Sequence, residues 1–314
     1  MPHAHPNLVH QDDVDPTSLD AADMRHRRRR LGAAGGARMI GASHYLVPAG
    51  ARMMPVHAHS DEEEIFHVLA GSGLLWEGGR TYPIAAGDTI VHRIQSAPHT
   101  LLAGEEDLEV LAFGEGSLTN ITYLPRPQAW WIGTRWMPAD GPNPFKREAA
   151  LGPLELPADG PTSRRPDTVV AFADVEEAHE VRPGFAITER NLAKAAGSVR
   201  SGLRHDVLAP GTLSCPPHWH TGEEELFVVL AGDGFAVLGE ERLPIRPGSV
   251  LVRPPNSGVA HTLQAGEDGL TYLAYGTRDP NDICFYPRSN KANFGGITFR
   301  LDVVDYWHGE ERPL

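Results

Sequence analysis

Apolar residues in this chain occur in short runs that end at glycine or proline, and long helical stripes are rare. The segment "EELFVVLAG", residues 224–232, is rich in β-branched and aromatic residues, which is typical of a buried strand. "GFAVLGEERLPIRPGSVLVRPP" (234–255) predicts two further strands with tight turns, and "GLTYLAYG" (269–276) predicts another. Turn signals recur about every 8–12 residues, so the pattern predicts an all-β sandwich or barrel. Short helices are expected only around residues 20–31 and 187–196.

The sequence matches itself when it is shifted by 161 residues. His57, His59, Glu64 and Gly71 then fall on His218, His220, Glu225 and Gly232. After a one-residue insertion near Ser257, "PHTLLAGEED" (98–107) aligns with "AHTLQAGEDG" (260–269). A period of this length indicates a duplicated domain, because solenoid repeats are much shorter.

The duplication divides the chain into four parts. We expect an N-terminal arm (1–37), a first domain (38–137), a linker rich in proline and glycine (138–166) and a second domain (167–314). Whether the arm packs on a domain or is partly disordered stays open at this stage.

Composition narrows the class of protein. Hydrophobic residues make up 41% of the 314, enough for a core, and no apolar run is long enough for a transmembrane helix. The polar N-terminus lacks the apolar region of a signal peptide, and two cysteines, Cys215 and Cys284, argue against a disulfide framework. We therefore expect a cytoplasmic protein that has no membrane partner.

The charge argues against nucleic acid as a partner. The formal net charge is −13, which disfavours binding to nucleic acid and to anionic membranes. One basic run, "RHRRRR" (25–30), is a candidate anion contact, but a solvated arm or helix segment is the favoured interpretation.

Each repeat carries three histidines and a glutamate that can converge. Alternate side chains of a strand share a face, so the two histidines of each H-x-H pair point the same way. The glutamate begins the next strand, and a third histidine lies further along the chain. The predicted metal ligands are His57, His59, Glu64 and His99 in the first half, and His218, His220, Glu225 and His261 in the second.

This donor set suits a divalent first-row metal, one in each domain. Iron is the first choice, with manganese, nickel, copper and zinc as alternatives. Four protein ligands in an octahedral shell leave two positions for substrate, water or dioxygen.

The sequence also predicts which residues around the donors are buried and which are exposed. Phe66, Val68, Phe227 and Val229 share the inward face of the glutamate strands and should form an apolar wall, whereas His67 points outward. The neighbouring glutamates are expected in solvated turns: Glu62, Glu63, Glu223 and Glu224. A surface role is favoured over substrate contact for His92, Arg93 and Arg253.

Two further features are assigned more loosely. Cys215 is interpreted as a small core residue, with a place at a pocket mouth as the alternative. The aromatic stretch Trp130–Trp136 is expected to seal one domain against the other or against the linker, with a lid over the first site as the alternative.

The motifs resemble those of the cupin superfamily. The residues are "HAHSDEEEIFHVLAG" (57–71) with "PIAAGDTIVHRIQSAPHT" (83–100), and "HWHTGEEELFVVLAG" (218–232) with "PIRPGSVLVRPPNSGVAHT" (244–262). Gly50 and Gly211 stand one residue further from the first histidine than the usual pattern, which leaves the donors undisturbed. Two copies resemble the bicupins, and the resemblance implies two tandem jelly-roll (double-stranded β-helix) barrels, each with a metal inside.

The function expected from this site is a dioxygenase acting on a small aromatic or enol-type substrate. In this interpretation Glu64 and Glu225 also act as catalytic bases. One alternative is a redox-neutral isomerase, decarboxylase or lyase acting on a small acid or sugar. The other is a non-catalytic protein that binds a small molecule. The expected partners are a small-molecule substrate and dioxygen, and homo-oligomerisation stays open.

Overall fold

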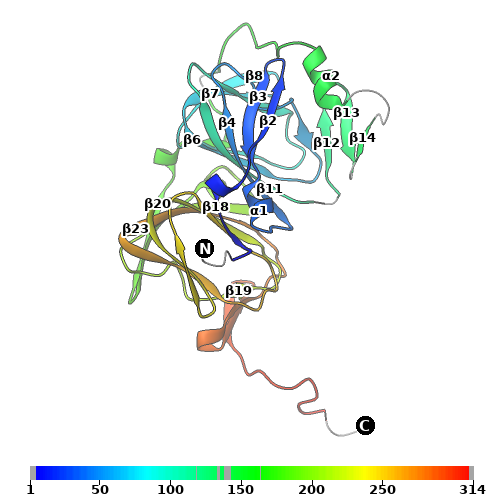
Figure 1. The fold of residues 1–314 in the computed structure, drawn as a ribbon. Helices are drawn as coiled ribbons and strands as arrows, with labels where there is room; N and C mark the ends of the chain where they lie inside the picture. The colour runs from blue at the N-terminus through cyan, green and yellow to red at the C-terminus, as the bar shows by residue number, and fades with distance from the viewer. Residues whose placement is uncertain (1–4, 118, 133–134, 138–142, 163, 311–314) are drawn as a thin grey trace.

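The computed structural model describes residues 5–117, 119–132, 135–137, 143–162 and 164–310 of the chain. It confirms the all-β prediction: two jelly-roll barrels lie one on the other, and the C-terminal segment leads away from the second barrel (Figure 1). Among these residues, no helix has the length and apolar character needed to cross a bilayer.

The N-terminal barrel is built from three sheets. In spatial order the largest contains β15 (Val169–Val170), β9 (Thr89–His92), β6 (Glu64–Ala70), β11 (Leu108–Glu115), β4 (Ile40–Val47), β3 (Met24–Arg29) and β2 (Thr17–Ala21). The second contains β10 (His99–Ala103), β7 (Ser72–Glu77) and β8 (Arg80–Ala85). The third contains β14 (Arg135–Met137), β13 (Ala129–Ile132), β12 (Ile121–Leu124) and β5 (Ala58–His59).

The C-terminal barrel repeats this plan with longer, continuous strands. Its main sheet contains β1 (Leu8–His10), β22 (Ser249–Arg253), β20 (Glu225–Leu238), β23 (His261–Thr277), β18 (Ser201–Leu208), β17 (Phe185–Asn191) and β16 (Glu177–Arg182), and β21 (Glu241–Ile245) pairs with β20. A smaller sheet contains β19 (Trp219–His220), β24 (Cys284–Tyr286), β25 (Lys291–Phe294) and β26 (Ile297–Arg300).

Helices are few and short. They are α1 (Leu31–Ala34), α2 (Pro144–Ala150) and α3 (Leu192–Ala195), with single 3₁₀ turns at Gln11–Asp13, Phe172–Asp174 and Pro287–Ser289. The helices expected over residues 20–31 and 187–196 are therefore mostly wrong. Strands β3 and β17 occupy these segments because neighbouring strands satisfy their backbone groups, and each is followed by one helical turn.

The basic run lies mainly on β3, so the expectation of an arm or helix is wrong, whereas three of its arginines are exposed as expected of a solvated segment: Arg25, Arg27 and Arg30. This strand pairs with β2 on one side and with β4 on the other. The guanidinium of Arg28 lies over the ring of Tyr45 and donates a hydrogen bond to the Ser43 hydroxyl. The run is thus part of the wall of the barrel.

The two barrels exchange their first strands. Strand β1, near the N-terminus, pairs with β22 of the C-terminal barrel, with Val9 opposite Val250. In the reverse direction β15, which follows the segment between the barrels, pairs with β9, with Val169 opposite Ile90. Each barrel therefore completes its main sheet with a strand from the segment that precedes the other barrel in the sequence. The domain boundaries given above stay a prediction.

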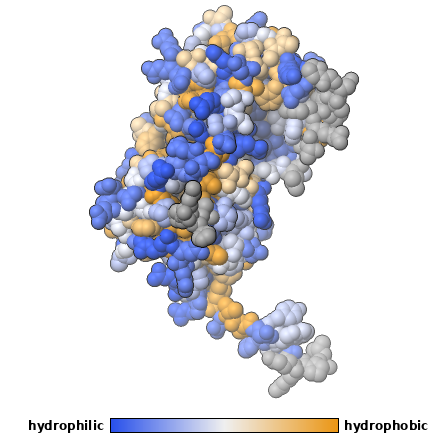
Figure 2. Space-filling model, in the orientation of Figure 1, coloured by the Kyte–Doolittle hydropathy of each residue, from blue (hydrophilic) through white to orange (hydrophobic). Residues whose placement is uncertain are grey.

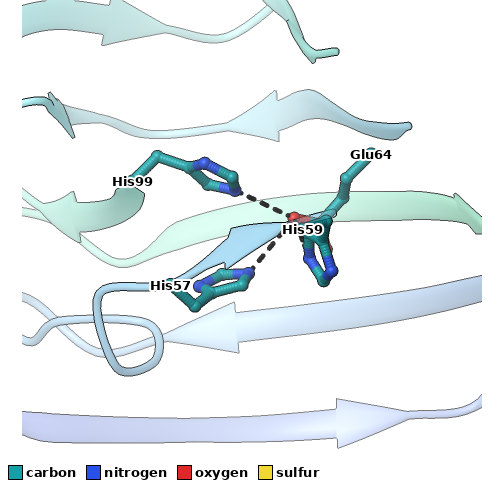
Figure 3. A group of neighbouring side chains, drawn as sticks. All are labelled: His57, His59, Glu64 and His99. Atoms are coloured by element: carbon teal, nitrogen blue, oxygen red, sulfur yellow. Dashed lines mark hydrogen bonds and ion pairs between the residues drawn. The ribbon is translucent and has the colours of Figure 1, made fainter. Parts of the chain in front are cut away.

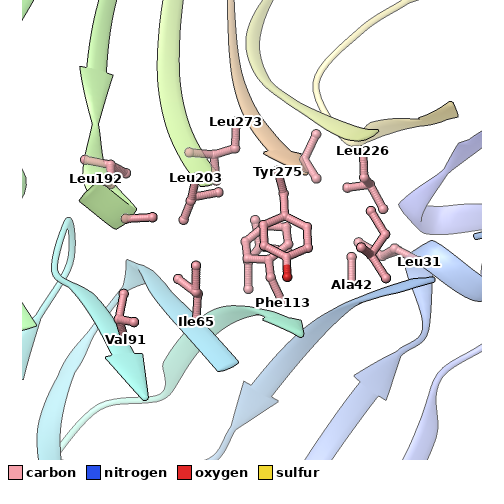
Figure 4. Packing of buried hydrophobic residues seen from close by; sticks show 14 of the residues in the cluster. Leu31, Ala42, Ile65, Val91, Phe113, Leu192, Leu203, Leu226, Leu273 and Tyr275 are labelled. Atoms are coloured by element: carbon pink, nitrogen blue, oxygen red, sulfur yellow. The ribbon is translucent and has the colours of Figure 1, made fainter. Parts of the chain in front are cut away.

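A shared apolar core joins the barrels. Side chains from both halves interdigitate there, and the Phe113 and Tyr275 rings lie 5.0 Å apart (Figure 4). The buried members labelled in the figure are Leu31, Ala42, Ile65, Val91 and Phe113 from the first half, and Leu192, Leu203, Leu226, Leu273 and Tyr275 from the second.

Two buried glutamates cross this interface in opposite directions. Glu63 accepts hydrogen bonds from the Val199 and Ser201 amides and from the Ser198 and Ser201 hydroxyls. Its counterpart Glu224 accepts from the backbone amides of residues 38–40. Both glutamates are 0% exposed, so the expectation of solvated turns is wrong for them. Their carboxylates satisfy the backbone amides at the start of a strand in the other barrel.

The segment between the barrels is fastened to the N-terminal barrel. Asn143 caps α2 by accepting from the Phe145 amide. From this helix the buried carboxylate of Glu148 accepts from Arg52 and Arg126, both at 2.7 Å. Residues 138–142 and 163 of the predicted linker lie outside the described residues.

Candidate metal centres

The four donors predicted in the N-terminal barrel come together (Figure 3). His57 and His59 lie beside and on β5, Glu64 begins β6 and His99 begins β10. The Oε2 atom of Glu64 lies 3.4, 3.7 and 3.2 Å from the Nε2 atoms of His57, His59 and His99, respectively. One potential ligand atom from each residue lies within 4.8 Å of the others, a grouping that suits a single cation.

The C-terminal barrel repeats this arrangement. The Oε2 atom of Glu225 lies 3.9, 3.6 and 2.8 Å from the Nε2 atoms of His218, His220 and His261. His218 and His220 lie beside and on β19, Glu225 begins β20 and His261 begins β23. The quartets correspond in sequence and in their place in each barrel, but the C-terminal one is looser. Ligand atoms of His218, Glu225 and His261 lie within 4.8 Å of one another, whereas His220 groups instead with His218 and Cys284, or with Glu223 and Asp282.

Backbone carbonyls orient several of the imidazoles. The Nδ1 atoms of His57 and His99 lie 2.9 and 3.1 Å from the carbonyl oxygens of Pro55 and Ala97. In the other barrel Nδ1 of His218 lies 3.0 Å from the Pro216 carbonyl. A proton held on Nδ1 leaves Nε2 free for a metal, which is the usual arrangement of histidine ligands.

The electrostatics of both centres suit a cation. Burial alone would raise the pKa of Glu64, but the three neighbouring histidines hold it well below its usual range. The pKa of Glu225 is also lowered, because His261, His220 and His218 outweigh burial. Burial lowers the pKa of His261 to about 4, against the opposing effect of Glu225. Ionised carboxylates and neutral imidazoles are the forms that bind metals. Against the effect of burial, Glu64 raises the pKa of His57, and Cys215 with Glu225 raises that of His218 to about 9, so these two imidazoles release a proton when a cation binds.

Unpartnered atoms at the centres test whether the residues fit a metal. The buried Nε2 atom of His59 makes no hydrogen bond among the described residues. Nε2 of His261 and Oε2 of Glu225 lie 2.8 Å apart as an ion pair, but neither atom makes a hydrogen bond among these residues. Buried polar atoms normally have a partner, so these atoms fit a cation as the missing one. The chain therefore carries two His₃Glu groups of a metal-binding kind, and the assignment of each ligand stays a prediction.

The predicted apolar wall is confirmed. Phe66, Val68, Phe227 and Val229 are all buried, and the rings of Phe66 and Phe227 lie 6.3 and 5.8 Å from those of His99 and His261. His67 is buried too, but its Nδ1 atom lies 2.9 Å from the Thr89 hydroxyl and it does not join the donor group.

Other expectations near the centres are wrong. His92 and Arg253 are 1% and 4% exposed, because each sits directly opposite the ligand glutamate on the neighbouring strand. Only Arg93 of this set is exposed. Glu62 and Glu223 are partly buried and lie 3.5 and 3.8 Å from the Nδ1 atoms of His59 and His220.

A cavity of about 670 Å³ opens over the C-terminal donors. Its wall includes His218, His220, Glu225 and the guanidinium-bearing Arg204, and also Cys215, which was expected in the core. The sequence interpretation missed Arg204. The self-alignment carried a signal for it, because Ser43 occupies the matching position in the first repeat and only the second repeat has a charge there.

Asp282 was also missed. Its Oδ2 atom lies 2.6 Å from the Nδ1 atom of His220, in the place where carboxylates commonly support histidine ligands. It lies in the stretch "NDICFYPRSNK", to which no role was assigned from the sequence. The equivalent residue of the first repeat, Asn120, places an amide 3.0 Å from Nδ1 of His59.

The opening beside the N-terminal centre is lined by different residues. A cavity of about 580 Å³ is lined by His59 together with Ile121, Tyr123, Trp130 and Ile132. The Tyr123 and Trp130 rings stack at 5.0 Å, and Trp130 is 42% exposed. Trp130 therefore does not seal one barrel against the other, and its position favours the alternative of a cover over the first site. Residues 133 and 134 of the aromatic stretch lie outside the described residues.

Comparison with known proteins agrees with the fold. The family model of the cupin domain matches twice, over residues 43–114 and 204–273. Oxalate decarboxylase from Bacillus subtilis at pH 4.6 superposes with a TM-score of 0.58 and 17% identity over 88% of this chain and 77% of that chain. The formate complex of the Lactobacillus farciminis oxalate decarboxylase gives 0.58 and 14% over 91% and 90%. No curated protein matches the sequence.

The two matched domains and the two jelly-roll barrels define the class of protein. The chain is a bicupin, a member of the cupin superfamily with two cupin domains. At 14–17% identity, the likeness to the decarboxylases concerns the fold alone.

Proposed function

We propose that this bicupin is a metal-dependent enzyme that catalyses a redox-neutral reaction, decarboxylation above all, on a small carboxylic acid in its C-terminal barrel. The observation that carries the proposal is the cavity of about 670 Å³, which connects three of the four donors with Arg204; these donors are His218, His220 and Glu225. Its volume lies in the range of small-molecule sites, about 300–1,000 Å³. Metal donors and an arginine in one cavity suit a ligand with a carboxylate group.

Arg204 is held in place by two carboxylates. Its Nη1 atom lies 3.3 Å from Glu189 and its Nη2 atom 3.5 Å from Asp206, which is buried. Contacts of this length leave N–H donors for a bound anion, and a planar guanidinium matches a carboxylate in a bidentate fashion. Ser43 and Tyr45 take the places of Arg204 and Asp206 in the N-terminal barrel. The cavity beside Ser43 is lined instead by Arg28 and Arg30, and none of the donor histidines lines it.

The chemistry follows from these groups. A divalent cation bound by the donors would supply Lewis-acid stabilisation of the negative charge that develops on a substrate oxygen. Arg204 would hold the carboxylate, while Phe227 and Ala274 contribute an apolar wall. In decarboxylation the carbon–carbon bond breaks, carbon dioxide leaves and a proton takes its place on carbon, so no external oxidant is consumed.

Structural likeness to two oxalate decarboxylases supports the redox-neutral reaction over the dioxygenase reaction that the sequence first suggested. The role of Glu225 as a base stays a prediction. It is compatible with the proposed reaction, because the carboxylate of Glu225 also lines the cavity.

The test is a screen of short mono- and dicarboxylic acids with the protein loaded in turn with manganese, iron, cobalt, nickel and zinc. We expect release of carbon dioxide without net oxygen uptake, measured together with an oxygen electrode. Arg204→Met should lower kcat/KM about 10- to 100-fold, since hydrogen bonds to charged groups contribute about 1.5–3 kcal/mol.

Ser43→Ala, at the equivalent place in the other barrel, is the matched control and should leave kcat/KM unchanged. Consumption of one oxygen molecule per turnover, or full activity of Arg204→Met, would contradict the proposal.

One observation favours dioxygenase chemistry as a second candidate, in the N-terminal barrel. The stacked Tyr123 and Trp130 rings beside His59 suit a planar aromatic or enol-type substrate. His220→Ala keeps the N-terminal donors intact, so oxygen uptake by this variant with an aromatic substrate panel tests the second candidate separately.

A further inference from the structure

The two candidate metal centres differ at one structurally equivalent position beside the ligand glutamate. In the N-terminal barrel Glu64 on β6 is paired with His92 on β9. In the C-terminal barrel Glu225 on β20 is paired with Arg253 on β22. Both partners are almost completely buried, at 1% and 4% exposure, so a charge at this position acts on the centre with little screening by solvent.

His92 brings no lasting positive charge to its centre. Its ring stacks face to face on the ring of His99, with centroids 3.4 Å apart and an interplanar angle of 2°. Its Nδ1 atom lies 3.2 Å from the Glu77 carboxylate. An imidazole beside a carboxylate therefore packs against the N-terminal donors.

Arg253 gives the C-terminal centre a permanent positive charge. A guanidinium stays protonated in proteins. Its Nη2 atom donates to the Ser257 hydroxyl at 3.1 Å and to the Val259 carbonyl at 2.9 Å, both neutral groups. The buried Nε has no hydrogen-bond partner among the described residues, and Leu238 stands where the first repeat has Glu77.

Arg253 and the donors share one space. A small hollow is lined by Arg253 together with His220, Glu225 and His261. No acidic side chain other than the ligand glutamate and Glu223 lines this hollow. The charge of Arg253 therefore acts on the place where the donors converge, and interactions between charges are strong in such a buried setting.

We propose that Arg253 sets the ligand preference of the C-terminal centre. Its charge lowers the affinity of the centre for a divalent cation and raises the affinity of the metal-loaded centre for an exchangeable anion. Asp282 acts in the opposite sense, because its carboxylate supports His220 and keeps the cation bound. The N-terminal centre has neutral groups, His92 and Asn120, in place of Arg253 and Asp282. We therefore expect it to bind an anion more weakly than the C-terminal centre does. The inference does not depend on which reaction takes place in the cavity.

The experiment uses the full chain carrying His59→Ala, which leaves the C-terminal donors intact. The metal-free protein is titrated with cobalt(II), followed by its visible absorption, and then with sodium azide. Residues around a metal typically change its affinity about 10- to 100-fold. We therefore expect Arg253→Met to bind cobalt about tenfold more tightly and azide about tenfold more weakly. Arg253→Lys keeps the charge and should stay within about threefold of the parent protein for both ligands.

The sign of the change separates this role from a structural one. If Arg253 only fastened the loop through Ser257 and Val259, Arg253→Met would weaken cobalt binding. Weaker or unchanged cobalt binding in Arg253→Met, or unchanged azide binding, overturns the proposal. Should this variant fail to fold, His92→Arg in a His220→Ala background gives the reciprocal test. It should weaken cobalt binding and strengthen azide binding at the N-terminal centre, and no change in either would overturn the proposal.

Discussion

At the scale of single residues, the Nδ1 partners of the histidines distinguish the two centres. Asp282 places a carboxylate on His220, whereas Asn120 places an amide beside His59. Asp282 is itself fixed by hydrogen bonds from the Gly222 and Glu223 amides to its other oxygen. A carboxylate partner raises the basicity of the imidazole and its strength as a metal ligand.

Exchange of these two residues should change metal affinity in opposite directions. Asp282→Asn should weaken cobalt(II) binding at the C-terminal centre about tenfold, and Asn120→Asp should strengthen it at the N-terminal centre. Competition with a chelator measures each affinity, with His59→Ala or His220→Ala used to isolate one centre. A change in the same direction at both centres would show that the Nδ1 partner does not control affinity.

At the scale of the elements, one glycine in each motif allows the sheet to bend just beyond the ligand strand. Gly232 has a φ of +76°, and a Cβ there would lie 2.2 Å from the Gly269 carbonyl oxygen. The register between β20 and β23 shifts at this point, as expected at a β-bulge. Gly71 has the same role between β6 and β7, with a φ of +81° and 2.1 Å to the Asp107 carbonyl. The glycine that ends each motif is therefore required by close backbone approach.

Gly232→Ala should lower the free energy of unfolding by about 3 kcal/mol or more, because it adds a steric clash to the strain of a positive φ. Gly211→Ala is the matched control. Gly211 has a φ of +74° with open space around its Cβ position, so only the backbone strain of about 1 kcal/mol applies. Urea denaturation of both variants checks the difference, and equal losses would show that the close approach is relieved at no cost.

At the scale of the whole molecule, the barrels behave as one unit. They exchange strands β1 and β15, share an apolar core and are joined by the reciprocal bonds of Glu63 and Glu224. Each of these glutamates directly precedes a ligand glutamate in the sequence. The same strand end therefore supports a metal centre in one barrel and satisfies backbone amides of the other.

Glu63→Gln should lower the free energy of unfolding by about 2–4 kcal/mol, because an amide cannot accept all the hydrogen bonds that converge on this buried carboxylate. The exposed Glu106→Gln is the control and should stay within about 0.5 kcal/mol of the parent. Denaturant unfolding followed by tryptophan fluorescence gives both values. A loss no larger than that of the control would mean that the interface is stabilised by its apolar core alone.

The C-terminal segment is the part of the molecule that lies outside this unit. Beyond β26 it leads away from the barrel, and Figure 2 shows apolar side chains where it leaves the barrel and more hydrophilic ones farther out. Val303, Tyr306 and Trp307 are 92%, 87% and 65% exposed. Homo-oligomerisation stays a prediction, and sedimentation of the full chain would measure it.

Much of the fold and of the candidate centres follows from local pattern. Short apolar runs that end at glycine predicted the strands, and the two copies of one motif predicted the two barrels. Alternation along a strand placed His57 with His59, and His218 with His220, on one face. These inferences succeed because side-chain direction in a strand depends on the parity of sequence position, which the sequence states directly.

The surroundings of several charged side chains could be determined only from the way the strands pair in the tertiary structure. Whether Glu63 faces solvent or the other barrel, and whether Arg253 lies on the surface or beside the donors, depends on which strand pairs with which. The same holds for Arg204, whose cavity is formed by strands and loops far apart in sequence. By itself the sequence determined the repeat, the strands and the donors, because these depend on local spacing. The tertiary structure decided the environment of each charge, because burial and charge pairing are set by contacts between distant segments.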